Sequence, residues 1–253
     1  DPDGCKDVII TDCNIRTGDD CIVIKSTEGD PCENITVSNC ILRSGCTALK
    51  LGTESLGDIR NIIFSNCIVP DSNAGVSLYM KDGSCYENIL VSNLVMQVRN
   101  EFPLLIDVTP RYYNKPVSGT IRNIHFENLT VTGKGRCYIE GARDNPIKNL
   151  SFRNITWNIT APCDGRHAKK PSGARRVETD PEGAINYAAH PYQFIAVNVD
   201  GLRLDDIGIC YKSRDIGPDR GLFFGRGLER LRLNWAEMPP VPAGIEPVDA
   251  GTE

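Results

Sequence analysis

A segment of about eleven residues returns along this chain at a fixed interval. It reads CKDVIITDCNI from Cys5, CENITVSNCIL from Cys32, IRNIIFSNCIV from Ile59 and YENILVSNLVM from Tyr86, a step of 27 residues each time. Weaker copies begin at Ile121, Ile147, Val199 and Leu228. An internal period of this length is typical of repeat architectures, in which each repeat packs on its neighbours and a site is built from several repeats.

Within each segment the apolar residues alternate, as in Ile35, Val37 and then Cys40. Alternation indicates a β-strand with one buried face. An Asn or Asp immediately before the cysteine position interrupts the alternation and predicts a corner between two short strands, because these side chains bond to nearby backbone. The corner residues are Asp12, Asn39, Asn66, Asn93, Asn128 and Asn154. A further strand follows about ten residues later, so no room remains for a helix.

These patterns predict an all-β chain, a right-handed single-stranded parallel β-helix that forms a solenoid of about eight coils. Stacked coils place Ile22, Leu49 and Val76 in one interior row, with neighbouring strands roughly 4.8 Å apart. A leucine-rich repeat is the nearest alternative, but its repeats are shorter and richer in Leu. A β-propeller needs more strands and a longer period.

One continuous array needs no internal domain boundary, so we expect the β-helix to cover residues 1–235. Residues 160–190 break the period and predict an inserted loop. Residues 236–253 are Pro-rich and predict a poorly ordered tail. Solenoids need a capping element at each open end, and residue 1 leads almost directly into the first repeat. We therefore expect an N-terminal segment that is missing from this sequence.

Composition narrows the range of partners. The net charge of −5 disfavours nucleic acid, and no apolar run is long enough to cross a membrane. Eleven cysteines are present, and Cys13, Cys40 and Cys67 occupy equivalent positions. Buried cysteine packs as a small hydrophobe, so stacked free thiols are favoured. A few disulfides stay open as an alternative for a secreted protein. No Cys or His spacing indicates a metal site.

Gly18-Asp19-Asp20-Cys21 is the strongest candidate for chemistry. Strict alternation would point Asp20 into the core, and burying that charge is costly, so we expect the chain to bend here and present both carboxylates to one groove. Paired carboxylates suit inverting glycoside hydrolysis, in which one acts as acid and the other as base. A solvated acidic turn is the alternative.

The segments GDDCIVIKS and NITVSNC, together with their spacing, resemble the polygalacturonase family of glycoside hydrolases, family 28. The similarity runs through most of residues 1–157. It implies a right-handed β-helix that cleaves pectin backbones without a cofactor, outside the cell or in the periplasm. It also implies that Asp19 is the general acid, and that Asp20 activates water together with an Asp of an NTD motif upstream of Asp1.

The rest of the family pattern is altered. The GHG motif of the family corresponds to Cys46-Thr47-Ala48, which places Thr47 where the histidine is expected. The R-x-K motif corresponds to Ser77-Leu78-Tyr79, so both of its cations are replaced.

Stacking suggests substitutes for these cations. Val23, Lys50 and Ser77 should form one outward row, and Lys25, Gly52 and Tyr79 the next. We therefore predict that the groove around the carboxylates binds substrate through the following residues: Lys25, Lys50, Thr47, Tyr79, Lys81 and Arg111. Lysines can bind a uronate carboxylate, and a tyrosine can stack on a sugar ring. Solvated lysines and a packing role for the tyrosine are the alternatives.

Three functions remain open. The first is an inverting glycosidase that acts on an acidic plant cell-wall polysaccharide such as pectin, polygalacturonan or rhamnogalacturonan, and loss of the cationic motif disfavours plain polygalacturonan. The second is a non-catalytic carbohydrate-binding or structural β-helix, which the altered motifs favour. The third is a polysaccharide lyase on the same fold, which would use calcium and a basic residue.

Overall fold

The computed structural model describes residues 1–99, 102–108, 119–162, 191–212, 216–235 and 240–251. These residues form an all-β structure of sixteen strands, and none of them lies in a helix. All pairings between the strands are parallel. No helix of this described part is long and apolar enough to span a membrane.

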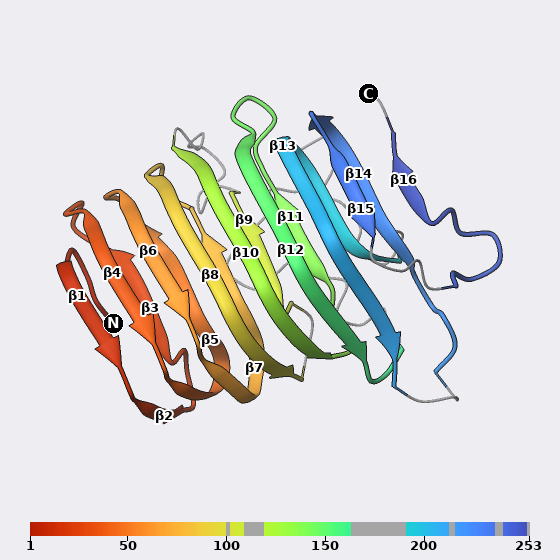
Figure 1. Ribbon diagram of the computed structural model, residues 1–253. Coiled ribbons are helices and arrows are strands. Elements are labelled where there is room, and N and C mark those ends of the chain that lie inside the picture. The colour runs from red at the N-terminus through yellow and green to blue at the C-terminus, as the bar shows by residue number, and fades with distance from the viewer. Residues whose placement is uncertain (100–101, 109–118, 163–190, 213–215, 236–239, 252–253) are drawn as a thin grey trace.

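Two ladders of strands run along the molecule, one in front of the other in Figure 1. The front ladder consists of β1 (Lys6–Thr11), β4 (Cys32–Ser38), β6 (Ile59–Ser65), β8 (Cys85–Val98), β10 (Thr120–Gly133), β12 (Ile147–Ile159), β13 (Tyr192–Tyr211) and β15 (Arg232–Trp235). The rear ladder consists of β3 (Ile22–Ser26), β5 (Ile41–Ser55), β7 (Ile68–Tyr79), β9 (Leu104–Asp107), β11 (Cys137–Glu140), the start of β13, β14 (Gly221–Glu229) and β16 (Val248–Ala250). The short β2 (Asn14–Thr17) pairs with the start of β5.

The register within the ladders follows the repeat. Ile22 pairs with Leu49, and Leu49 pairs with Val76, as the sequence predicts. All three side chains are buried in the core between the ladders. A second interior row lies in the front ladder, where Phe126 pairs with Phe152 and their rings stack at 4.9 Å. Continuous apolar rows explain why each repeat needs its neighbour in order to bury its core.

The corners of the repeat are fixed by two rows of asparagine and aspartate. The predicted row, Asp12, Asn39, Asn66, Asn93, Asn128 and Asn154, has positive φ throughout, between 50° and 56°. A second row that the sequence analysis overlooked has the same geometry: Asp7, Asn34, Asn61, Asn88, Asn123 and Asn149. Along this row each side-chain amide donates to the side-chain oxygen one repeat earlier. Asparagine suits these corners because it tolerates the left-handed backbone and bonds sideways.

The described cysteines are all free thiols, which agrees with the favoured prediction; Cys163 lies outside the described residues. Cys40 and Cys67 are each 1% exposed and stack in the core beside Cys13. Burial raises the pKa of the Cys67 thiol to about 11, so this row is neutral at ordinary pH.

The C-terminal segment differs from the expected loose tail. Residues Val248–Ala250 form β16, which pairs in parallel with β14. Arg226 anchors the strand, because its guanidinium contacts the Asp249 carboxylate at 2.8 Å. The prolines of this segment therefore do not prevent β16 from joining the rear ladder. The predicted loop at residues 160–190 lies almost wholly outside the described residues.

Candidate active site

The acidic pair lies at a bend immediately before β3. The Asp19 main-chain N–H donates to the Thr17 hydroxyl at 3.1 Å, and the Ser44 hydroxyl donates to the Asp19 carbonyl oxygen at 2.7 Å. Gly45 passes so close that a Cβ placed on it would lie 2.2 Å from the Gly18 carbonyl oxygen. The first strands of the rear ladder thus hold the bend from the neighbouring repeat.

Asp20 is held on both of its oxygens. Its Oδ1 accepts the main-chain N–H of Thr47 at 2.8 Å, and its Oδ2 contacts Lys50 Nζ at 2.7 Å. The side chain is 10% exposed. Burial raises the pKa of this carboxyl, but the hydrogen bonds and charge of Lys50, with the Thr47 N–H, outweigh burial and lower the pKa below its usual value. Asp20 is therefore a fixed anion at neutral pH.

Asp19 is exposed, in contrast to its neighbour. Its Oδ1 accepts the main-chain N–H of Asp20 at 2.8 Å. One oxygen from each carboxylate and the Cys46 sulfur lie within 4.8 Å of one another. Burial, followed by the nearby Asp20 carboxylate, raises the pKa of the Cys46 thiol. A neutral thiol and a carboxylate already bound to Lys50 make poor metal ligands, so the chemistry of this group suits proton transfer better than metal binding.

The three predicted lysines all lie in ion pairs. Lys50 pairs with Asp20, as described above. Lys25 Nζ lies 2.9 Å from Asp1 Oδ2. Lys81 Nζ lies 2.5 Å from Asp107 Oδ2, and the two side chains are 1% and 0% exposed. Among the described residues, the Lys81 ammonium group is therefore buried and not exposed at the surface.

Of the two predicted outward rows, one is observed in the strand register and the other is not. Val23, Lys50 and Ser77 pair in register as predicted, but Val23 and Ser77 are buried. The next row breaks, because the register shifts after Ile24 and Ser26 pairs with Ser55. Lys25 is consequently held by residues 1–3 and not stacked on Gly52.

Tyr79 lies between two of the lysines. Its ring centre is 5.6 Å from the Nζ atoms of both Lys50 and Lys81. Burial and then the Asp107 charge raise the pKa of its hydroxyl. Thr47 is 4% exposed and serves Asp20 through its main chain. Arg111 lies outside the described residues.

Asp107, the partner of Lys81, was not identified from the sequence. It ends the apolar strand β9 and pairs in register with Tyr79. Asp107 could have been found from the sequence, because it is the one carboxylate in the apolar run FPLLIDV and lies one repeat beyond Tyr79. Arg99 was also missed; it pairs with Asp71 and donates to the Ser44 carbonyl oxygen at 3.0 Å, close to the bend.

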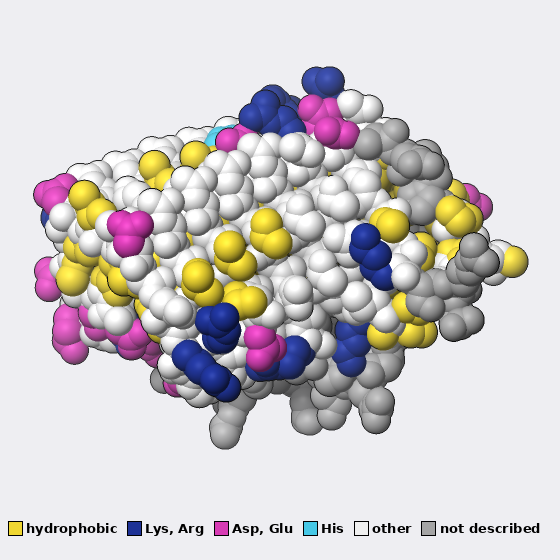
Figure 2. Space-filling model, turned by 60° about the horizontal axis from the view of Figure 1, so that its bottom comes forward, with side chains coloured by type: hydrophobic (Ala, Val, Ile, Leu, Met, Phe, Trp, Pro, Cys, Tyr) yellow, Lys and Arg dark blue, Asp and Glu magenta, His cyan; other side chains and the backbone are white. Residues whose placement is uncertain are grey.

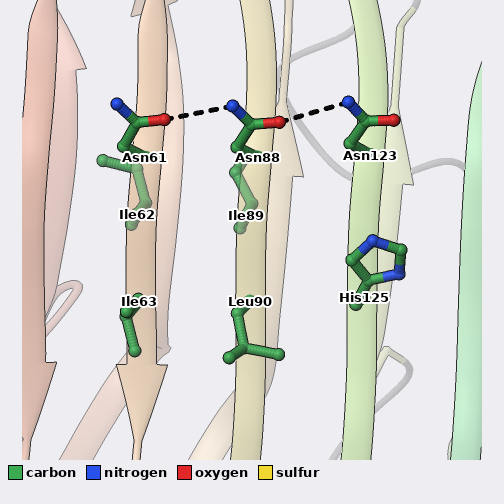
Figure 3. Close-up of a pocket in the computed structure, with 8 residues that line it drawn as sticks. All are labelled: Asn61, Ile62, Ile63, Asn88, Ile89, Leu90, Asn123 and His125. Atoms are coloured by element: carbon green, nitrogen blue, oxygen red, sulfur yellow. Dashed lines mark hydrogen bonds between the residues drawn. The ribbon is translucent and has the colours of Figure 1, made fainter.

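A separate groove lies on the front ladder across β6, β8 and β10, with a cavity volume of about 320 Å³. It is lined by Asn61, Ile62, Ile63, Asn88, Ile89, Leu90, Asn123 and His125 (Figure 3). The three asparagines bond to one another within the corner row, and His125 Nδ1 lies 2.7 Å from the Ser151 hydroxyl. This groove contains no carboxylate, so the acidic pair remains the candidate site.

Comparison with known proteins gives an independent result. The family model of the glycosyl hydrolases family 28 matches residues 1–171. A hyperthermoactive exopolygalacturonase from Thermotoga maritima is similar in structure, with a TM-score of 0.56 and 28% identity. The similarity covers 62% of this chain and only 38% of that one. The search among curated proteins found no significant match. Because the family model covers more than half of the sequence, the chain belongs to glycosyl hydrolases family 28.

Proposed function

We propose that this protein is a glycosidase that hydrolyses O-glycosyl bonds in an acidic plant cell-wall polysaccharide, of the pectin, polygalacturonan or rhamnogalacturonan type. One observation carries the proposal: an exposed carboxylate, Asp19, lies directly beside a carboxylate that Lys50 and the Thr47 N–H keep ionised. Glycoside hydrolysis needs two carboxyl groups in different states of protonation. Family membership and the similarity to an exopolygalacturonase support the same class.

We propose the roles of the two carboxyl groups from their positions and from what the family resemblance implies. Asp19 is exposed and can protonate the departing glycosidic oxygen. Asp20 stays charged and helps to orient and deprotonate the attacking water, which leads to inversion at the anomeric carbon. The oxygens lie within 4.8 Å of each other, whereas most inverting enzymes separate the two groups by about 6.5–9.5 Å. Asp20 would therefore act as only part of the base, as the family resemblance implies.

The architecture that goes with this function is a right-handed β-helix of about eight coils. The parallel ladders and their 27-residue register support it. We also propose that the protein acts outside the cell or in the periplasm, where a polymeric substrate would be met. Fractionation of the source cells would test the location, since enrichment in the cytoplasmic fraction would contradict it.

The function is tested by measuring new reducing ends in pectin, polygalacturonan and rhamnogalacturonan. Asp19→Asn should lower the rate by about 10²–10⁴-fold, which is the usual value of a general acid. Asp30→Asn, which alters an exposed carboxylate beyond the other end of β3, is the matched control and should leave the rate unchanged. Proton NMR of the first product should show the inverted anomer.

Each rival function has its own outcome in this experiment. Rapid hydrolysis by the Asp19→Asn protein would remove Asp19 from the acid role. An unsaturated product that disappears with a chelator would identify a lyase. Binding of the polymers without any product would identify a carbohydrate-binding module.

A further inference from the structure

Arg99 connects the fourth repeat to the bend that carries the acidic pair. It follows the last residue of β8, and its main-chain N–H donates to the Ser72 carbonyl oxygen of β7 at 2.8 Å. Its side chain extends one strand further, to β5, where Nη2 donates to the Ser44 carbonyl oxygen at 3.0 Å. A single residue therefore joins three strands that pair in succession, β5, β7 and β8.

Ser44 in turn contacts Asp19. The Ser44 hydroxyl donates to the Asp19 carbonyl oxygen at 2.7 Å and accepts the Cys46 main-chain N–H at 2.8 Å. Ser44 is 3% exposed, so water does not readily replace either partner. In the described part of the chain, no other residue outside the first repeat forms a hydrogen bond with Asp19. The place of Asp19 relative to the second repeat therefore depends on this hydroxyl group.

The strand ladder is irregular beside Ser44. This residue pairs with Thr17 of β2 on one side, but on the other side the register between β5 and β7 shifts between Ser44 and Thr47. Such a shift interrupts the ladder locally and lets the strand bend. The Arg99 guanidinium group lies at this irregularity, and its charge makes the hydrogen bond to the Ser44 carbonyl stronger than a neutral one.

Asp71 orients the Arg99 side chain. Its carboxylate contacts Nη1, while Nη2 contacts the main chain of β5. Asp71 continues the register row of Arg16 and Arg43. Figure 2 shows Lys and Arg side chains gathered around an acidic one on the lower side of the molecule, where β5 and β7 lie in Figure 1. The Asp71 and Arg99 side chains are 56% and 46% exposed, so their ion pair adds little stability by itself.

We propose that Arg99 is a positioning residue for the acidic pair, which acts through Ser44 and determines where the Asp19 carboxyl group lies beside Asp20. The inference rests on the proposed hydrolase function and adds a residue from three repeats beyond the pair. A general acid has to lie within hydrogen-bond reach of the oxygen that it protonates. A displacement of about 1 Å can lower a rate about a hundredfold. Without Arg99 both carboxyl groups remain, but the bend that carries them loses its anchor.

The kinetic test compares Arg99→Gln with Arg122→Gln. The control removes an arginine of similar exposure, 51%, from its ion pair with Glu87 on the front ladder. We expect Arg99→Gln to lower kcat by about 10–100-fold with little change in KM, because the acid is displaced while the binding surface is kept. Arg122→Gln should leave both constants unchanged. Arg99→Lys, whose ammonium group can donate to the same carbonyl oxygen, should recover part of kcat. An unchanged kcat in Arg99→Gln would overturn the inference.

A double variant tests the route through Ser44. Ser44→Ala removes the hydroxyl group that donates to Asp19 and should also lower kcat. If Arg99 acts through that group, Arg99→Gln should lower kcat much less in the Ser44→Ala protein than in the wild-type protein. Full multiplication of the two separate effects, in proteins of equal Tm, would contradict this route.

Alkylation of Cys46 tests the positioning without any turnover. The Cys46 N–H donates to the Ser44 hydroxyl, and its thiol is half-buried at the acidic pair. We expect iodoacetamide to modify Cys46 several-fold faster in Arg99→Gln than in the wild-type protein or in Arg122→Gln. The exposed Cys210 is the internal reference, and peptide mass spectrometry gives both rates. Equal rates at Cys46 would overturn the inference. Faster modification in a protein whose wild type cleaves no polymer would support the positioning and contradict the hydrolase function alone.

Discussion

The ionisation of Asp20 depends on Lys50. Burial raises the pKa of the Asp20 carboxyl, and Lys50 is the largest influence that opposes burial, ahead of the hydrogen bonds from Cys46 and the Thr47 main chain; together they lower the pKa below its usual value. A carboxyl group whose pKa is lowered on folding stabilises the fold above its unfolded pKa of about 3.8. That stabilisation is lost as the pH falls through the lower, folded value.

We therefore predict that Lys50→Gln lowers the free energy of unfolding by roughly 2–4 kcal/mol at pH 7. The effect should shrink toward zero near pH 3, where Asp20 becomes protonated in the variant and its charge no longer needs a partner. Urea denaturation at the two pH values measures this. Lys148→Gln, which alters an exposed lysine, serves as the control. An equal loss at both pH values would show that Lys50 acts by packing and not by charge.

Some residue positions at the site could be predicted from the sequence and others could not. The row Val23, Lys50 and Ser77 was predictable, because alternation and a fixed period determine which residues share a face. The position of Lys25 was not, because the register shift between Ile24 and Ser26 leaves no mark in the sequence pattern. The partners of Lys50 and Lys81 depend on side-chain conformations, which a repeat does not specify.

The strands are joined by corners at which one residue adopts the left-handed backbone conformation. Asn88 has φ of 56°, donates its side-chain amide to Asn61 and accepts that of Asn123. One corner row was predictable because asparagine interrupts the apolar alternation near each cysteine position. The other row was overlooked, because its asparagines stand at polar positions where nothing interrupts the pattern.

We predict that Asn88→Ala lowers the free energy of unfolding by roughly 2–4 kcal/mol. Alanine pays about 1–2 kcal/mol for the left-handed backbone, and two hydrogen bonds are lost at about 1 kcal/mol each. Asn88→Gly should recover the backbone part only, since glycine tolerates this φ. Chemical denaturation of the three proteins separates the two contributions. Equal stability of the alanine and glycine variants would show that the backbone conformation carries little of the cost.

The complete array is most strongly packed at its middle. Strands β6, β8, β10 and β12 each have a neighbouring strand on both sides, and their inward residues are buried. The first strand, β1, contains no fully buried residue, and neither does β2. In a linear array each repeat is stabilised by its neighbours, so protection of the backbone should fall toward the first strands.

We predict that hydrogen exchange followed by mass spectrometry will give the slowest amide exchange in β6 to β12 and faster exchange in β1 and β2. Exchange from the β1 and β2 amides should speed up further in mild denaturant, before the middle strands respond, because local opening there exposes little apolar surface. Uniform protection along the array would instead indicate that the strands open as one cooperative unit.

The hydrogen bonds that asparagines make between repeats have a consequence for chemical modification. Five asparagines stand in Asn-x-Ser/Thr sequons that a glycosylating cell would recognise: Asn34, Asn128, Asn149, Asn154 and Asn158. In each of them the side-chain nitrogen, the atom to which a glycan would be attached, already donates a hydrogen bond to the preceding repeat. Attachment of sugar and closure of the neighbouring repeats compete for the same five atoms. A chain that folds quickly should therefore emerge from such a cell unmodified at these positions, and a chain that is modified first should fold poorly.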